Sequence, residues 1–287
     1  MQSSWALEEG RYGRRLVVMG RWSDTVLDAV LGSGAKELEL NYARGWEGDD
    51  VAWLRQVPHL EAIDIVHRTI MDISPVNGLH QLRYLGVSTY CKTRLDFSNW
   101  PQLEECALDE WRPGAASLFE HQGVRRLVIS KYLGTDFSPF SGMGNLRELR
   151  LLSPSRLQSC RGVGSLERLT LLEMSRASKL DTLVGIEELS CLQRLELHSC
   201  KKIASIVPVA SLSHLTSFYC CDCGRIDSIQ PLATSTDLEE FLFHESTHVL
   251  DGDLFPLLGL PSLRVAVFAA RAHCSHTPEE IDAALSG

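Results

Sequence analysis

A short pattern of apolar residues recurs along almost the whole chain. Within a nine-residue segment, apolar residues occupy positions 1, 4 and 6, and polar or mixed residues stand between them. Examples are "LRELRLL" at 146–152, "LQRLELHSC" at 192–200 and "LEEFLFHES" at 238–246. About twelve such segments begin at residues 13, 35, 60, 82, 103, 124, 146, 166, 192, 215, 238 and 263, at intervals of 20 to 26 residues. A repeat of this length is typical of a solenoid, because each unit buries its apolar side chains against its neighbours.

The repeat resembles that of the leucine-rich-repeat family, whose unit reads L-x-x-L-x-L-x-x-N/C-x-L. Cys200 and Cys223 occupy the ninth position, where that family places Asn or Cys. The stretches between segments share an apolar-x-Pro-apolar step, at 73–76, 137–140, 206–209, 229–232 and 254–257. Proline suits the start of a short helical turn, since it has no amide to donate. In this step the chain is similar to internalins and to phosphatase-regulatory leucine-rich proteins.

The resemblance implies an α/β fold. The expected architecture is a curved right-handed leucine-rich-repeat solenoid of about twelve units, with a parallel concave sheet and short helical or 3₁₀ returns on the convex side. We expect a single domain over residues 1–287, made of an N-terminal cap and first unit (1–34), the repeats (35–262), and a last strand with a C-terminal cap helix (263–287).

Helix signals stand near both ends of the repeat array. The stretch at 23–34, "SDTVLDAVLGSG", has a serine cap, an apolar stripe and a glycine stop, which predicts an α-helical return. The stretch at 49–57, "DDVAWLRQV", reads the same way. Thr277, followed by Pro278 and by Glu280 at the third helical position, forms a capping box. We therefore expect a short final helix after Thr277.

Composition narrows the classes of function and the compartment. The net charge of −9 argues against nonspecific binding to nucleic acid or to anionic membranes as the main activity. The first residues carry no apolar stretch after a basic start, and no run approaches eighteen apolar residues, so neither a signal peptide nor a membrane span is predicted. Nine scattered cysteines indicate reduced, buried thiols rather than a disulfide framework. We expect a cytoplasmic protein.

One stretch has the H-E-x-x-H spelling of zinc metalloproteases, from His244 through Glu245 to His248. On a helix, two such histidines share one face and hold zinc, and the glutamate activates the bound water. The repeat register places His244 and Glu245 at positions 7 and 8, beyond the end of a strand, and His248 in the turn that follows. The register therefore predicts a protein that is not an enzyme. A zinc-dependent hydrolase using His244-Glu245-x-x-His248 is the competing hypothesis.

Two cysteine-containing groups could in principle bind a metal. Cys220 and Cys223 form a single C-x-x-C pair at inward positions, which predicts buried, inert thiols because a structural zinc site needs four ligands. His198, Cys221 and His244 share position 7 in three successive units, so their side chains could meet on neighbouring strands and hold Zn²⁺ or Ni²⁺. Solvated polar side chains are the simpler interpretation, and no cofactor is predicted.

Residues between the inward positions define a predicted binding face. Binding in leucine-rich arrays uses the concave strand face, here at positions 3, 5, 7 and 8 of each segment. The N-terminal part of that face is acidic and aromatic, and the middle is rich in arginine. The candidate partner-binding residues are Tyr42, Asp64, Tyr84, Asp109, Glu110, Lys131, Arg150, Arg168, Arg194, Glu196, His198, Tyr219, Asp222, His244 and Glu245.

These residues support two interpretations. One is a salt-bridged face that is simply solvated. The other is the footprint of a partner, in which tyrosine and arginine tend to anchor the interface. We predict non-enzymatic recognition of another protein, rather than nucleic acid or membrane, by an adaptor, a regulatory subunit or an immunity protein that neutralises a toxin.

Overall fold

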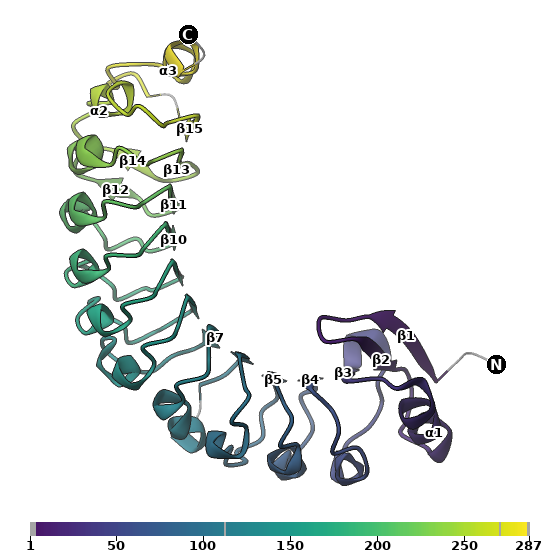
Figure 1. The fold of residues 1–287 in the computed structure, drawn as a ribbon. Coiled ribbons are helices and arrows are strands. Elements are labelled where there is room, and N and C mark those ends of the chain that lie inside the picture. Colours follow the sequence, from purple (N-terminus) through teal and green to yellow (C-terminus); the bar gives the residue numbers. More distant parts are fainter. Residues whose placement is uncertain (1–3, 112, 270, 286–287) are drawn as a thin grey trace. The chain divides into compact units, whose positions relative to one another are not determined.

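The computed structural model describes residues 4–111, 113–269 and 271–285, in which short strands alternate with short helical returns (Figure 1). The strands of the main sheet are β1 (Trp5–Glu9), β2 (Arg14–Val18), β3 (Glu37–Asn41), β4 (Ala62–Val66), β5 (Tyr84–Ser88), β6 (Glu105–Leu108), β7 (Arg126–Ser130), β8 (Glu148–Leu152), β9 (Leu171–Ser175), β10 (Arg194–His198), β11 (Ser217–Cys221), β13 (Glu240–Phe243) and β15 (Val265–Phe268). A two-stranded sheet joins β12 (Arg225–Ile226) to β14 (His248–Val249).

Most returns are 3₁₀ helices. They are η1 (Tyr42–Arg44), η2 (Ala52–Gln56), η3 (Ser74–Gly78), η4 (Phe97–Asn99), η5 (Pro113–Glu120), η6 (Ser138–Gly142), η7 (Val163–Ser165), η8 (Ile186–Glu188), η9 (Val207–Ser211) and η10 (Gln230–Thr234). The α-helices of the described residues are α1 (Asp24–Ser33), α2 (Phe255–Leu258) and α3 (Pro278–Leu285). A proline stands at the first or second position of η3, η6, η9, η10 and α2, which confirms the prediction for the apolar-x-Pro-apolar step.

The strands of the main sheet follow one another in chain order. β1 pairs antiparallel with β2, whereas β2 to β7 and β8 to β11 pair in parallel, each with the next strand. β13 and β15 continue the parallel order after β11. Thirteen strands of the described residues thus form a mostly parallel sheet with helical returns, which is the predicted leucine-rich-repeat solenoid. No described helix has the length and apolar character needed to cross a membrane.

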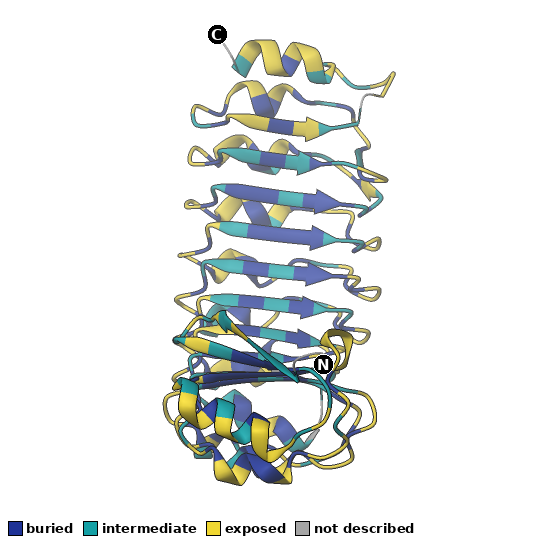
Figure 2. Ribbon diagram, turned by 90° about the vertical axis from the view of Figure 1, so that its right-hand side faces the viewer, coloured by how far each residue is buried: buried dark blue, intermediate teal, exposed yellow. Residues whose placement is uncertain are grey.

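The chain divides into two compact units, the first ending at Ile129 and the second beginning at Ser130. In each unit the inward leucines, isoleucines, valines and phenylalanines are almost completely buried. Figure 2 shows the resulting alternation of buried and half-buried residues along the strands, with exposed residues concentrated on helices and turns. The single domain over residues 1–287 stays a prediction.

The helices predicted at 23–34 and after Thr277 are confirmed, but Ser23, the predicted cap of the first, makes no side-chain capping hydrogen bond. α1 ends at Gly34, which adopts the left-handed conformation. At α3 the Thr277 hydroxyl accepts from the Glu280 amide (3.2 Å) and the Glu280 carboxylate accepts from the Thr277 amide (2.8 Å), which is a complete capping box. The α-helix predicted at 49–57 is wrong, because the structure forms the 3₁₀ helix η2 there. A 3₁₀ helix advances about 2.0 Å per residue against 1.5 Å for an α-helix, so it spans a short return with fewer residues.

The predicted register is also wrong in one segment. β9 pairs Leu171 with Arg194, which stands at position 3 of its own segment. The segment containing β9 therefore begins at Leu169, three residues after the predicted start at 166. Both frames fit the pattern, because Leu166, Leu169 and Leu171 match positions 1, 4 and 6 of the earlier frame as well. The strand pairing in the sheet shows that the segment begins at Leu169. Leu171 is therefore at position 3 and points away from the core.

Candidate functional site

The residues at positions 3, 5 and 7 of each nine-residue segment point away from the core. They define what we call the open face of the sheet. β8 illustrates the alternation: Leu149 and Leu151 are fully buried, whereas Glu148, Arg150 and Leu152 are half-buried. Successive side chains of a strand point to opposite sides, so each open-face residue lies beside its counterpart on the next strand. Within each unit the helical returns other than η1 lie on the other side of the strands (Figure 1).

In the first unit, the turn between β1 and β2 folds over the open face. Tyr12 of this turn donates its backbone amide to the Glu37 carboxylate of β3, and its hydroxyl lies 3.3 Å from Glu105 Oε1 of β6. Arg11 forms an ion pair with Glu105. The Arg83 guanidinium lies 4.3 Å from the centre of the Tyr12 ring. The turn is therefore fixed to strands far from it in the sequence, and the sequence pattern gave no signal of these contacts.

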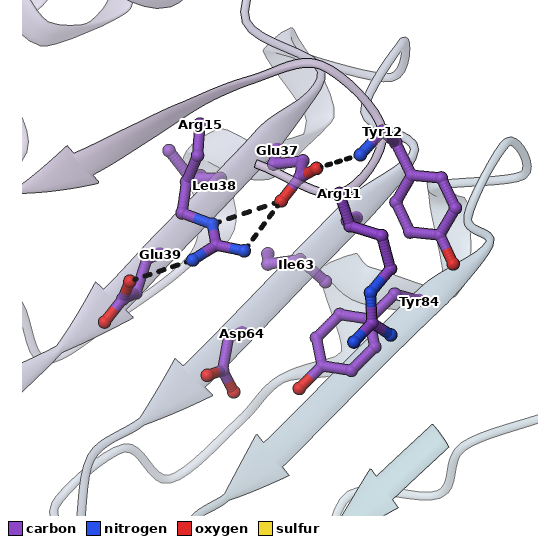
Figure 3. Close-up of a pocket in the computed structure, with 10 residues that line it drawn as sticks. Arg11, Tyr12, Arg15, Glu37, Leu38, Glu39, Ile63, Asp64 and Tyr84 are labelled. Carbon is purple, nitrogen blue, oxygen red and sulfur yellow. Dashed lines mark hydrogen bonds and ion pairs between the residues drawn. The ribbon is translucent and has the colours of Figure 1, made fainter. Parts of the chain in front are cut away.

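A cavity of about 190 Å³ lies between this turn and the strands. Figure 3 shows Asp64 of β4 and Tyr84 of β5 side by side at this cavity. Burial, reinforced by the nearby charge of Glu39, raises the pKa of Asp64 from 3.8 to about 6. The lining residues are Arg11, Tyr12, Arg15, Glu37, Leu38, Glu39, Ala62, Ile63, Asp64 and Tyr84.

The predicted residues of the first unit fall into two groups. Asp64 and Tyr84 line the larger cavity, as described above. Tyr42, Asp109 and Glu110 instead line a smaller hollow of about 80 Å³ next to β5. The acidic and aromatic character predicted for this part of the face is thus gathered at two hollows.

In the second unit, a row of charged and aromatic side chains crosses β8 to β11 at and beside position 5. Arg150 Nε lies 3.5 Å from Glu173 Oε2. Arg194 forms an ion pair with Glu196, and its guanidinium lies 4.4 Å from the centre of the Tyr219 ring. We call Arg150, Glu173, Arg194, Glu196 and Tyr219 the central row.

The Tyr219 end of the central row is held by β13. The Tyr219 hydroxyl donates to the Glu240 carboxylate, and the Ser217 hydroxyl donates to the same carboxylate at 3.1 Å. These bonds fix the orientation of the Tyr219 ring on the open face. The row is therefore an ordered surface across neighbouring strands.

Arg168, which the sequence placed on the open face, is not part of it. The corrected register puts Arg168 before β9, where its side chain is exposed and its Nη1 lies 2.9 Å from Asn145 Oδ1. The position-3 residue of this strand is Leu171 instead. The error has the same cause as the register error, namely the two overlapping leucine frames.

Three further candidates, Lys131, Asp222 and Glu245, occupy turns that follow strands. All three have left-handed backbone, with φ of 55°, 52° and 60°. The same conformation recurs at position 8 in the intervening segments, at Ser153, Arg176 and Ser199. L-residues are strained in this conformation, so the turn geometry is imposed by the repeat.

This strain predicts an unusual order of stabilities at Glu245. Both Glu245→Gly and Glu245→Ala remove the side chain, but only glycine accepts φ near 60° without strain. We expect the glycine variant to be more stable than the alanine variant by about 1 kcal/mol, measured by urea unfolding. At the exposed Asp28 in α1 the order must reverse, since alanine is favoured over glycine inside a helix. Equal stabilities of the two Glu245 variants would contradict the left-handed turn.

The three residues proposed as a possible metal column do not converge. Cys221 Sγ lies 3.2 Å from His244 Nε2, whereas His198 Nε2 lies 3.1 Å from Glu196 Oε2. His198 instead belongs to a group with Glu173 and Glu196, whose nearest ligand atoms lie within 4.8 Å of one another. The register brought the backbones together as predicted, but each histidine turns to a different neighbour.

The H-E-x-x-H stretch is not helical. His244 follows β13, Glu245 is in the left-handed turn, and His248 begins β14, where its amide donates to the Gly224 carbonyl at 2.8 Å. The predicted separation of His244 from His248 is confirmed, with the difference that His248 lies in a short strand. The two histidines therefore do not share the helical face that this zinc motif requires.

The C-x-x-C pair is buried as predicted, since Cys220 and Cys223 are completely inaccessible. Cys200, at the same position as Cys223, donates to the Met174 carbonyl (3.2 Å). The general prediction of buried thiols is wrong for Cys191, which is exposed, and for Cys274, which is half-buried.

Comparison with known proteins identifies the fold but not a close relative. No protein-family model matches the chain, and no curated protein matches it either. Among solved structures, an internalin (InlF) from Listeria monocytogenes has a TM-score of 0.57 and 19% sequence identity, over 77% of this chain and 71% of that chain. The leucine-rich-repeat ectodomain of the plant membrane receptor kinase GASSHO1/SCHENGEN3 from Arabidopsis thaliana has a TM-score of 0.50 and 15% identity, over 88% of this chain and 35% of that one. The chain thus has the leucine-rich-repeat fold that the resemblance implied.

Proposed function

We propose that this chain is a non-enzymatic recognition protein that binds another protein on the open face of its sheet. The central row is the observation that carries the proposal. Its side chains are held in two groups, Arg150 with Glu173 and Arg194 with Glu196 and Tyr219, so little conformational freedom is lost when a partner binds. Arginine and tyrosine are also the residue types that often contribute most of the binding energy at interfaces.

The class of partner follows from charge and fold. A net charge of −9 favours a basic protein over nucleic acid or an anionic membrane. The similar plant receptor ectodomain is in complex with CASPARIAN STRIP INTEGRITY FACTOR 2, which supports a polypeptide ligand for this fold. We include in the proposal a cytoplasmic role without a cofactor, as an adaptor, a regulatory subunit or an immunity protein that neutralises a toxin.

Charge reversal tests the central row. Partners captured from a native lysate are identified by mass spectrometry, and the affinity of each purified partner is then measured. We expect Arg150→Glu and Arg194→Glu each to weaken binding about tenfold or more, as the loss of an interface anchor does. Arg168→Glu is the matched control, because it makes the same charge change off the open face.

Three results would contradict the proposal. Equal loss of affinity in all three variants would indicate a nonspecific charge effect, and unchanged affinity in all three would indicate a merely solvated face. Stoichiometric zinc in the purified protein, with a peptidase activity abolished by Glu245→Gln, would contradict the non-enzymatic interpretation and support the hydrolase.

A further inference from the structure

The carboxylates at the larger cavity of the first unit differ in their partners. Glu37 accepts from Arg15 Nη2 at 3.0 Å, and Glu39 lies 3.0 Å from Arg44 Nη1. Asp64 makes no hydrogen bond or ion pair with any residue that the structure describes. It is also half-buried beside the negative Glu39, so its charge is poorly compensated.

Gly86 leaves the space that Asp64 and Tyr84 share. Gly86 stands in β5, at position 5 of its nine-residue segment, and pairs with Asp64 on the neighbouring strand β4. A Cβ added at Gly86 would overlap the Asp64 carboxylate and the Tyr84 hydroxyl oxygen. The adjoining cavity of about 190 Å³ is many times the 10–15 Å³ that a single water needs. The site is therefore large enough for the end of a long side chain.

The charges around the cavity favour a cationic ligand over an anionic one. Arg11 shares the Glu105 carboxylate with Arg126, and Arg15 lies against Glu37 and Glu39, so each arginine at the cavity already has a carboxylate partner. Asp64 has no such partner among the described residues. A cation would find the carboxylate of Asp64 and the hydroxyl of Tyr84, both of which accept hydrogen bonds from ammonium and guanidinium groups. The Tyr84 ring itself already lies 6.0 Å from the Arg11 guanidinium.

A metal ion suits the cavity less well than an organic cation. Mg²⁺ and Ca²⁺ need six or more oxygen ligands. Among the described residues, the group whose ligand atoms converge is Glu173, Glu196 and His198, which lies elsewhere. The cavity thus fits the chemistry of an amino-acid side chain.

We propose that this cavity receives an arginine or lysine side chain of the partner protein, with the Asp64 carboxylate as its counter-ion. The proposal rests on the proposed function, because it takes the open face as the interface. It adds a named contact point and a chemical requirement for the partner, namely a basic side chain that projects far enough to pass beside the β1–β2 turn. A free amine or guanidine has the same charged group, so the experiment must separate the two sources.

The first experiment titrates the full chain with N-acetyl-arginine methylamide, N-acetyl-lysine methylamide and, as a neutral control, N-acetyl-norleucine methylamide. Binding is followed by the NMR shift of the Gly86 amide. We expect weak binding of one or both cationic probes and none of the neutral one. Asp64→Asn should weaken that binding at least tenfold, whereas Asp28→Asn, the same charge change at an exposed site of α1, should leave it unchanged. Binding of the neutral probe, or full binding by Asp64→Asn, would overturn the proposal.

Gly86→Ala provides a second test without a change of charge. Its methyl group occupies the space of the Asp64 carboxylate and the Tyr84 hydroxyl, so we expect weaker binding of the cationic probe. Chemical shifts of residues outside the first unit report whether this variant folds. A folded Gly86→Ala protein that binds the probe as wild type does would contradict the assigned cavity.

The pH dependence separates Asp64 from the groups around it. Glu39 of β3, Arg15 of β2, Tyr84 of β5 and Arg11 of the turn face this carboxylate. Because Asp64 ionises with a pKa of about 6, binding of the arginine probe should strengthen about tenfold between pH 5 and pH 7.5. The response should vanish in Asp64→Asn, and a response that persists in this variant would overturn the role of Asp64.

The captured partner distinguishes this proposal from the proposed function. Loss of partner affinity on Asp64→Asn, and on replacement of one basic residue of the partner by Met, supports the cavity as a contact. If Arg150→Glu weakens the partner but Asp64→Asn does not, the cavity proposal fails and the recognition function stands. If the probe binds but no open-face variant affects any partner, the recognition function fails, and a small free cation replaces the partner side chain as the ligand.

Discussion

Replacing Asp64 by asparagine should stabilise the protein at pH 7.5 by about 3 kcal/mol and should give almost no gain at pH 4. Burial raises the pKa of Asp64 from 3.8 to about 6 in the folded chain, whereas the unfolded chain keeps the ordinary value. Folding therefore takes up a proton between these pH values, and the Asp64 contribution to stability falls as pH rises from about 4 to 6. The full difference is worth about 3 kcal/mol, and the attraction to Arg15 is already included in it.

Urea unfolding at several pH values measures this effect. Asp28→Asn serves as the control, because it removes the same charge from an exposed position. A gain of equal size at pH 4 and pH 7.5 would show that the amide stabilises by something other than the absence of a buried charge. The predicted result has a functional meaning, since a residue that destabilises the fold is typical of a site kept for binding.

The second large effect concerns the register of β9. In the structure Leu172 is completely buried, whereas Leu171 is half-buried on the open face. We expect Leu172→Ala to lower the free energy of unfolding by about 2–5 kcal/mol, because it opens a cavity in the core, and Leu171→Ala to lower it by less than about 1 kcal/mol. Urea unfolding of the two single variants is sufficient.

The frame that begins at 166 predicts the opposite order, with Leu171 inward at position 6 and Leu172 outward at position 7. A larger loss for Leu171→Ala would therefore restore that frame. It would also return Arg168 to the open face, and with it the need for another control in the partner experiment.

The sequence was informative where the structure is repetitive. A 20 to 26-residue period fixes which residues point inward, because each strand must bury the same positions against its neighbours. For the same reason Asp64 and Tyr84 could be placed on one face from their positions alone. The capping box at Thr277 could be recognised because its contacts lie within one helical turn.

Contacts between residues that are far apart in the sequence, and that do not recur from repeat to repeat, could not be predicted from the sequence. Tyr12 and Glu105 are 93 residues apart, and no period relates them. The cavity beside Asp64 depends on that turn and on the missing side chain at Gly86, so it could not be seen from strand positions. The histidine column failed for a different reason: His198 has a carboxylate two residues away on its own strand, and that contact competes with the next rung.

The direction of β1 has a consequence for self-association. The first strand of a parallel sheet exposes a row of unpaired backbone N–H and C=O groups at the sheet edge. The last strand of another copy could pair with these groups, and repeated pairing of this kind would produce filaments. β1 runs antiparallel to β2 and occupies that edge in the strand order of the described residues. Antiparallel and parallel ladders use different hydrogen-bond patterns, so a second copy meets no continuation of the repeat there. The β1–β2 hairpin therefore opposes the end-to-end stacking of copies into filaments at this edge.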